Sequence, residues 1–319
     1  MRRAELRGLV LAFLVFGVFW GAWAASLPAV RRQVGASDGQ LGLALAAIAL
    51  SAVPVMPVAG RVVDRYGARR TVPACLLLFA AVLWLPGLTH SVAALLPALV
   101  LVGLATGALD LVINAATAAW ERVEQAKLMN VVHGAFSSGV LVGSVCAGLA
   151  REAGASPLAI LLVVAVLTAL VGVTQPPYRQ APSEARRSGG RLPWFLVGVG
   201  LLTAGAFLCE DAIQSWSSLQ LERGLDASPA ISGLGPGLFA ASMAAGRFAG
   251  GAVANRVRDA VLFGAAALAL ALGAFVVATA GTSGVALAGL VVAGAGTSVL
   301  APVLYSAVGE HAAPGRQGA

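Results

Sequence analysis

Apolar stretches of about 20 residues follow one another along almost the whole chain, separated by short segments that hold nearly all of the arginines. A transmembrane helix needs roughly 20 mostly apolar residues. Ten such stretches are predicted, at about 8–28, 40–59, 71–88, 93–118, 128–149, 157–174, 194–214, 233–253, 260–280 and 284–307. Only 11% of the residues are charged, against about 25% in soluble domains. The sequence therefore predicts an all-α polytopic membrane protein.

The basic residues predict which side of the membrane each loop faces. With a cytoplasmic N-terminus, 17 of the 21 Lys and Arg residues lie inside and four lie outside: Arg31, Arg32, Arg151 and Arg223. Cytoplasmic loops normally carry this excess of positive charge. We expect a multi-pass protein of the cell inner membrane, in contact with lipid. Scattered basic loops explain the net charge of +7 without a nucleic-acid partner.

A repeat divides the chain into two halves. Residues 60–70 read GRVVDRYGARR and residues 251–259 read GAVANRVRD, an offset of 191 residues. Between the halves lies a segment rich in Pro, Ser, Gly and Arg, which is typical of a flexible linker. We predict an N-terminal six-helix bundle over 1–175, a cytoplasmic linker over 176–191, and an incomplete C-terminal bundle of four helices over 192–319.

The first copy of the repeat resembles the loop signature of the major facilitator superfamily at Gly60, Asp64, Arg65 and Gly67. Further motifs resemble an incompletely characterised bacterial inner-membrane branch that is similar to fucose-permease-type sugar porters. They are WAASLPAVR (23–31), Val112 to Asn114 with Glu121 and Arg122, His133 with Gly134, Glu210, Trp216 and GRFAGG (246–251). The resemblance implies two pseudo-repeated helical bundles around a central cavity that opens alternately to either side of the membrane.

The family fold has twelve helices, and the sequence supplies ten. Shifted by 191 residues, the fifth and sixth spans fall at about 319–340 and 348–365, and the chain ends at Ala319. We therefore expect the chain to be C-terminally truncated relative to the family.

The resemblance implies a cytoplasmic gating loop. Its candidate residues are Gly60, Asp64, Arg65, Gly67 and Arg69 in the first half, and Arg247, Gly251, Asn255 and Arg256 in the second half. Asp64 could accept hydrogen bonds at a helix N-terminus and pair with Arg65, which would hold the cytoplasmic face in one state. The alternative is a charge cluster that only keeps the loop inside. The second copy has Asn255 in place of the acid.

Acidic residues inside a span are costly and usually face protein or water. Asp110 lies in the fourth span with Asn114 one turn later, and no deeply placed cation is available to pair with it. Burial without a cation favours the protonated form, so Asp110 is a candidate proton carrier. The resembled sugar porters also place an acid in this helix. An interhelical hydrogen bond is the structural alternative.

Other polar and aromatic residues complete the candidate site. His133 and Glu210 are further proton-coupling candidates, although a histidine near a helix end is often structural. The substrate-cavity candidates are Trp20, Trp23, Asn114, Asn130, Ser137 and Gln214. Tryptophan rings can cover the apolar face of a sugar, but they also pack against lipid. Glycine pairs at 103/107 and 139/143 predict close helix contact.

These features together predict a secondary transporter, proton-coupled and monomeric, that moves a small polar solute such as a sugar by alternating access. One alternative is a proton-linked exporter of amphipathic small molecules, but the fifth span lacks the Gly-Pro pair typical of such antiporters, which favours uptake. Another alternative is a non-transporting receptor or a truncated remnant. No nucleophile–base pair, phosphate loop or metal-ligand spacing is present, so we expect no enzyme activity, cofactor or metal.

Overall fold

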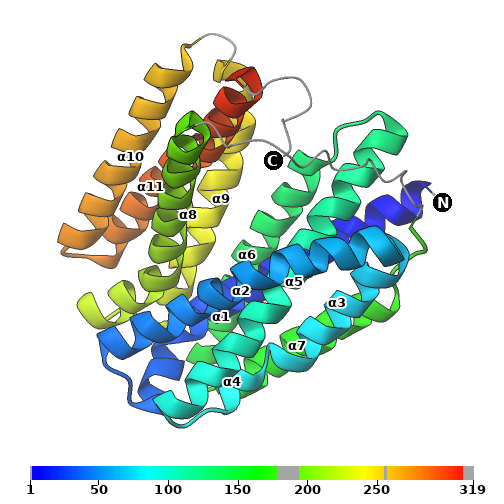
Figure 1. The fold of residues 1–319 in the computed structure, drawn as a ribbon. Helices are drawn as coiled ribbons and strands as arrows, with labels where there is room; N and C mark the ends of the chain where they lie inside the picture. Colours follow the sequence, from blue (N-terminus) through cyan, green and yellow to red (C-terminus); the bar gives the residue numbers. More distant parts are fainter. Residues whose placement is uncertain (1, 179–193, 255–256, 312–319) are drawn as a thin grey trace. The chain divides into compact units, whose positions relative to one another are not determined.

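The computed structural model describes residues 2–178, 194–254 and 257–311, which are helical apart from short turns (Figure 1). They belong to two compact units, residues 1–183 and 184–319. Seven of the described helices are long and apolar enough to cross a membrane. Each of the ten predicted spans corresponds to one helix, except 71–88, which comprises two. The prediction of an all-α polytopic membrane protein is therefore confirmed.

The described residues of unit 1 form seven helices, coloured from blue to green in Figure 1. They are α1 (Arg2–Val34), α2 (Asp38–Tyr66), α3 (Ala68–Val82), α4 (Leu85–Leu88), α5 (Val92–Glu124), α6 (Met129–Glu152) and α7 (Pro157–Val173). Hydroxyl caps begin three of them: the side chains of Ser37, Ser91 and Ser156 accept hydrogen bonds from the first turns of α2, α5 and α7. These caps satisfy backbone N–H groups that a helix N-terminus leaves without intrahelical partners.

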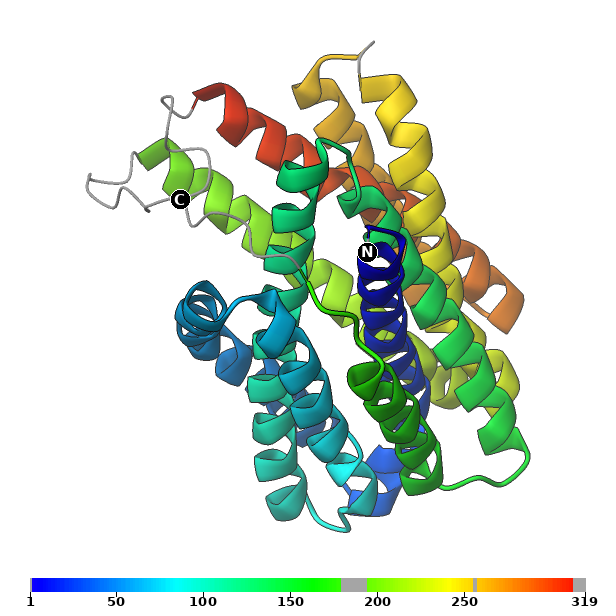
Figure 2. The same cartoon turned by 90° about the vertical axis from the view of Figure 1, so that its right-hand side faces the viewer.

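Glycines bring α1 and α6 into backbone contact. A Cβ added at Gly17 would lie 2.0 Å from the Phe136 carbonyl oxygen, and one added at Gly143 would lie 2.2 Å from the Val18 carbonyl oxygen. Residues later in α1 contact residues later in α6, so the two helices run parallel; they lie side by side in Figure 2. Small residues at such an interface replace side-chain interdigitation by close backbone packing, the usual way that membrane helices associate.

The α2–α5 interface is built in the same way. A Cβ at Gly103 would lie 2.4 Å from the Ile48 carbonyl oxygen, and one at Gly107 would lie 2.5 Å from that of Ala52. Both glycine pairs that the sequence identifies as packing residues therefore lie at helix interfaces.

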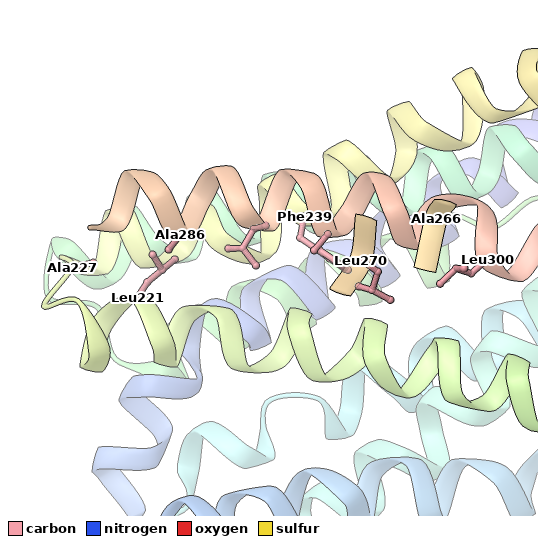
Figure 3. Close-up of a cluster of buried hydrophobic side chains, with 9 residues drawn as sticks. Leu221, Ala227, Phe239, Ala266, Leu270, Ala286 and Leu300 are labelled. Carbon is pink, nitrogen blue, oxygen red and sulfur yellow. The ribbon is translucent and has the colours of Figure 1, made fainter. Parts of the chain in front are cut away.

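Unit 2 contains α8 (Trp194–Leu219), a π-helical turn η1 (Gln220–Gly224), α9 (Pro229–Ala254), α10 (Asp259–Thr279) and α11 (Ser283–His311). A cluster of buried apolar side chains from η1, the loop after it, α9, α10 and α11 forms its core (Figure 3): Leu221, Ala227, Phe239, Ala266, Leu270, Ala286, Leu290, Ala293 and Leu300. Close approach again depends on glycine, because a Cβ at Gly273 of α10 would lie 2.3 Å from the Ala293 nitrogen of α11. Burial of these side chains holds the unit's helices together.

Candidate functional site

Asp110 lies in the middle of α5 and is half-buried. The side-chain amide of Asn114 donates to the Asp110 carboxylate oxygen Oδ1 at 3.0 Å and to the Asp110 backbone carbonyl at 2.9 Å. Within the described part of the chain, no arginine or lysine forms an ion pair with this carboxylate. The acid is therefore held by a neutral donor of its own helix, which stabilises its position without supplying a compensating charge.

The neighbouring stretch of α2 is interrupted by two prolines. Asp110 lies along α5 between two contacts with α2, that of Gly107 with Ala52 and that of Leu111 with Gly60. The α2 residues between these contacts include Pro54 and Pro57. Each proline lacks a backbone N–H, so the helix loses two of its hydrogen bonds there. The hydrogen bonding of α2 is therefore weakened beside Asp110, and α2 can bend more easily there.

The candidates on α6 lie in its first three turns. His133 is half-buried and its ring meets that of Phe13 edge-on, with 5.3 Å between ring centroids, so it contacts α1. Asn130 is exposed. Ser137 is 1% exposed, and its hydroxyl has no hydrogen-bond partner among the described residues. The three side chains therefore lie in different surroundings, and Asn130 is the accessible one.

The two tryptophans of α1 also differ. Trp20 is half-buried and packs edge-on against Phe16 and Phe19. Trp23 is only 1% exposed, and its indole N–H has no partner among the described residues. Phe16 and Phe19 in turn pack on Phe79 of α3, so this aromatic cluster joins α1 to α3. Trp20 keeps the accessibility that substrate contact requires, whereas Trp23 lies within the packed interior.

In unit 2 the candidates lie on α8. Glu210 and Gln214 are half-buried, and Asp211 is exposed. The charges that act on Glu210 are those of Arg247, on α9, and of its neighbour Asp211. Arg247 was expected in the gating loop, but α9 continues to Ala254 and places it inside the helix, close enough to influence Glu210. The sequence shows an arginine within a span but does not show which acid it approaches.

The loop after α2 is a tight turn. Gly67 has φ 73°, a backbone conformation that favours glycine, and α3 begins at the next residue. Asp64 is exposed in the last turn of α2, and among the described residues it forms no ion pair. The expected hydrogen bonds to a helix N-terminus are not formed with the adjacent α3, whose N-cap at Gly67 has no side-chain hydrogen bond. Arg65, its expected companion, instead lies over the Tyr66 ring, 5.4 Å from the centroid. Arg69 is exposed in the first turn of α3, and Gly60 faces Leu111 of α5.

The second copy of this loop follows α9. Gly251 lies within α9, whereas Asn255 and Arg256 fall outside the described residues. Their gating role stays a prediction.

Glu121 has a role that the residues alone did not reveal. One of its carboxylate oxygens, Oε1, accepts hydrogen bonds from the backbone N–H groups of Leu128 and Met129, the latter at 2.8 Å. A carboxylate from the end of α5 therefore caps the start of α6, where it also complements the positive end of the helix dipole. The distance of seven residues across a loop hides this cap from local pattern rules.

The described helices, arranged in two bundles with polar groups inside apolar spans, are those of a multi-pass membrane protein. A model of the Major Facilitator Superfamily matches residues 9–319, and the chain belongs to that superfamily. The family match confirms the resemblance that the loop signature at 60–70 indicated.

Two relatives illustrate its place in the family. An uncharacterised MFS-type transporter of Yersinia pestis is 29% identical over 307 residues, covering 94% of this chain and 79% of the relative. The membrane protein MosC of Rhizobium meliloti is 28% identical over 268 residues, covering 82% of this chain and 63% of the relative. The chain thus spans less than two thirds of MosC.

Solved structures share the fold. The nucleoside transporter NupG, as a D323A mutant, superposes with a TM-score of 0.76 at 14% identity, covering 98% of this chain and 85% of that chain. A bacterial homologue of the human lysosomal transporter Spinster, in an inward-facing and occupied conformation, superposes with a TM-score of 0.70 at 19% identity. The match covers 97% of this chain and 74% of that chain. At these identities the likeness establishes the fold alone.

Proposed function

We propose that the protein is a proton-coupled secondary transporter that takes up a small polar solute such as a sugar by alternating access. The observation that carries this proposal is Asp110, a carboxyl group inside a membrane span with a neutral hydrogen-bond donor and no cationic partner among the described residues. Such a group is stable in the membrane when protonated and becomes costly when charged. Loading and release of its proton can therefore be linked to a change of conformation.

The other candidates have supporting roles in this proposal. In unit 1, the Trp20 ring provides an apolar face for a sugar, and Asn130 provides an amide group for its hydroxyls. Gln214, in unit 2, is a separate candidate for hydrogen bonding to a polar solute. Glu210 and His133 are additional proton-exchanging groups. The excess of basic residues in the loops assigned to the inside supports an inner-membrane protein with a cytoplasmic N-terminus. We propose in addition that the protein acts as a monomer.

Transport in proteoliposomes tests the proposal. Purified protein is reconstituted, a pH gradient is imposed, and labelled sugars are added together with nucleosides, because a structural neighbour is named as a nucleoside transporter. We expect accumulation of a polar solute that follows the pH gradient and collapses when a protonophore is added. Uptake that is indifferent to pH would exclude proton coupling, and expulsion of amphipathic dyes on reversal of the gradient would favour an exporter.

Asp64→Ala is expected to slow transport without preventing substrate binding. We expect a fall of about fivefold in rate, equivalent to ~1 kcal/mol, the upper end of the range for an exposed acid that interacts with the N-terminus of another helix during gating. Rates come from initial uptake and affinity from substrate protection against thermal unfolding. Asp226→Asn is the control, because Asp226 is exposed in an outer loop with φ 50°, which asparagine tolerates. A loss of binding in Asp64→Ala would contradict a gating role.

A further inference from the structure

The start of the linker is part of unit 1. After α7 ends at Val173, residues 175–178, which we call the linker strap, fold back over the N-terminal part of α1. The side-chain amide of Gln175 donates to the carbonyl of Gly8 at 3.4 Å and to that of Val171 at 3.1 Å, and the Tyr178 hydroxyl donates to Gln175 Oε1. The strap therefore makes polar contacts with both α1 and α7.

Gly8 is the residue that permits this docking. A Cβ at position 8 would lie 2.6 Å from Pro176 Cδ and 2.6 Å from the Tyr178 hydroxyl oxygen. Both distances are far shorter than van der Waals contact, which for carbon atoms is about 3.5–4.0 Å. Any side chain at this position would push Pro176 and Tyr178 away from α1.

A small pocket lies beneath the strap. Its walls come from α1, the first residue of α3, α5 and the strap itself: Glu5, Ala68, Ala116, Ala119, Trp120, Val123 and Tyr178. Tyr178 is 6% exposed, Glu5 2% and Ala116 4%, so the strap covers side chains at the cytoplasmic end of the bundle. Across the rim, Arg2 pairs with Glu124 at 2.6 Å and ties α1 to α5.

We propose that the linker strap is a seal that closes the cytoplasmic end of unit 1 between α1 and α5 and keeps water-borne solutes out of the bundle interior. Tyr178 and Pro176 form its apolar cover, and Gly8 provides the seat on which they dock. Because the strap is also the first part of the connection to unit 2, it fixes one end of that connection to α1. This role is independent of which solute the protein transports.

Cysteine accessibility tests the seal. Ala116→Cys is introduced into protein in which Cys75→Ala, Cys146→Ala and Cys209→Ala remove the native thiols. A membrane-impermeant thiosulfonate is added to the cytoplasmic face of inside-out vesicles. We expect slow labelling at position 116 when the strap is intact. With Gly8→Leu or Tyr178→Ala, labelling should be at least about tenfold faster. The reason is that each ~1.4 kcal/mol lost from the free energy of docking raises the population of the open strap tenfold. Tyr178→Phe, which keeps the ring, should label as slowly as the unaltered strap.

Two control positions make the result decisive. Lys127→Cys, in the exposed loop between α5 and α6, should label rapidly in every background. Ala98→Cys, buried toward the outer end of α5, should stay slow in all of them. The seal is refuted if position 116 labels as fast as position 127 with the strap intact, if the strap variants leave its rate unchanged, or if they also expose position 98.

The strap also predicts an unusual tyrosine titration. Burial raises the pKa of the Tyr178 phenol well above its usual value of about 10, and the nearby Glu5 carboxylate raises it further. The folded state holds the phenol proton more tightly than the unfolded state does. The contribution of this proton to the stability of the folded protein is therefore complete below about pH 10 and is lost as the pH rises further. The measurement is the phenolate absorbance of the protein during a pH titration, from which the absorbance of the Tyr178→Phe variant is subtracted. At about pH 10, where free tyrosine is half ionised, this difference should remain near zero. A titration midpoint of the difference near about pH 10 would contradict burial of Tyr178 beneath the strap.

Discussion

Asp110→Asn is expected to abolish accumulation driven by a pH gradient while exchange of substrate across the membrane continues. Asparagine keeps an oxygen that can accept the hydrogen bond from Asn114, so the local geometry is preserved. It cannot take up or release a proton in the physiological range. We expect concentrative uptake to fall by about a hundredfold or more, the scale of losing a positioned proton-transfer group, with counterflow reduced far less.

The measurement compares uptake under an imposed pH gradient with counterflow at equal pH. Asp226→Asn, the same chemical change at an exposed position, serves as the control and should leave both unchanged. Undiminished pH-driven uptake by Asp110→Asn would exclude the residue as the proton carrier. Equal loss of uptake and counterflow would assign it to substrate binding or folding instead.

Gly17→Ala is expected to destabilise unit 1 strongly although it adds a single methyl group. The new Cβ would lie 2.0 Å from the Phe136 carbonyl oxygen and 2.8 Å from the Phe136 carbonyl carbon. These are backbone atoms of α6 and cannot rotate away, so α1 and α6 must separate along their interface. We expect the free energy of unfolding to fall by about 3 kcal/mol, the upper part of the range for overpacking, as measured by unfolding in detergent.

Gly39→Ala is the matched control. Nothing lies within 4 Å of a Cβ at Gly39, which is in the first turn of α2. Alanine has a higher helix propensity than glycine by up to about 1 kcal/mol, so this variant should be as stable as the parent or slightly more stable. Equal stability of the two variants would show that the α1–α6 interface is looser than the structure indicates.

Much of the fold follows from local sequence. A bilayer permits only helices or closed barrels and sets the helix length, so apolar runs of about 20 residues predict the spans whatever they pack against. The signature at 60–70 likewise depends on residues close together in the chain, and the repeat was found by comparing two such local segments, which begin at Gly60 and Gly251. Gly67 could be expected at a turn because its positive φ is cheap for glycine alone. These features were recognisable because each is decided within one or two turns of helix.

Pairings between distant segments were decided only by the tertiary structure. Glycines at 139 and 143 indicate close packing but not that α1 is the partner, because every apolar helix is an acceptable neighbour in lipid. Three such pairings are far apart in the chain. The cap of α6 joins Glu121 and Leu128, which are 7 positions apart. Arg247 lies 37 positions from Glu210, and Tyr178 lies 170 positions from Gly8. Whether such groups meet depends on helix rotation and register, which hydropathy leaves open because many rotations bury similar apolar area. The sequence by itself therefore determined which segments cross the membrane, and only the packed structure decided which polar groups meet.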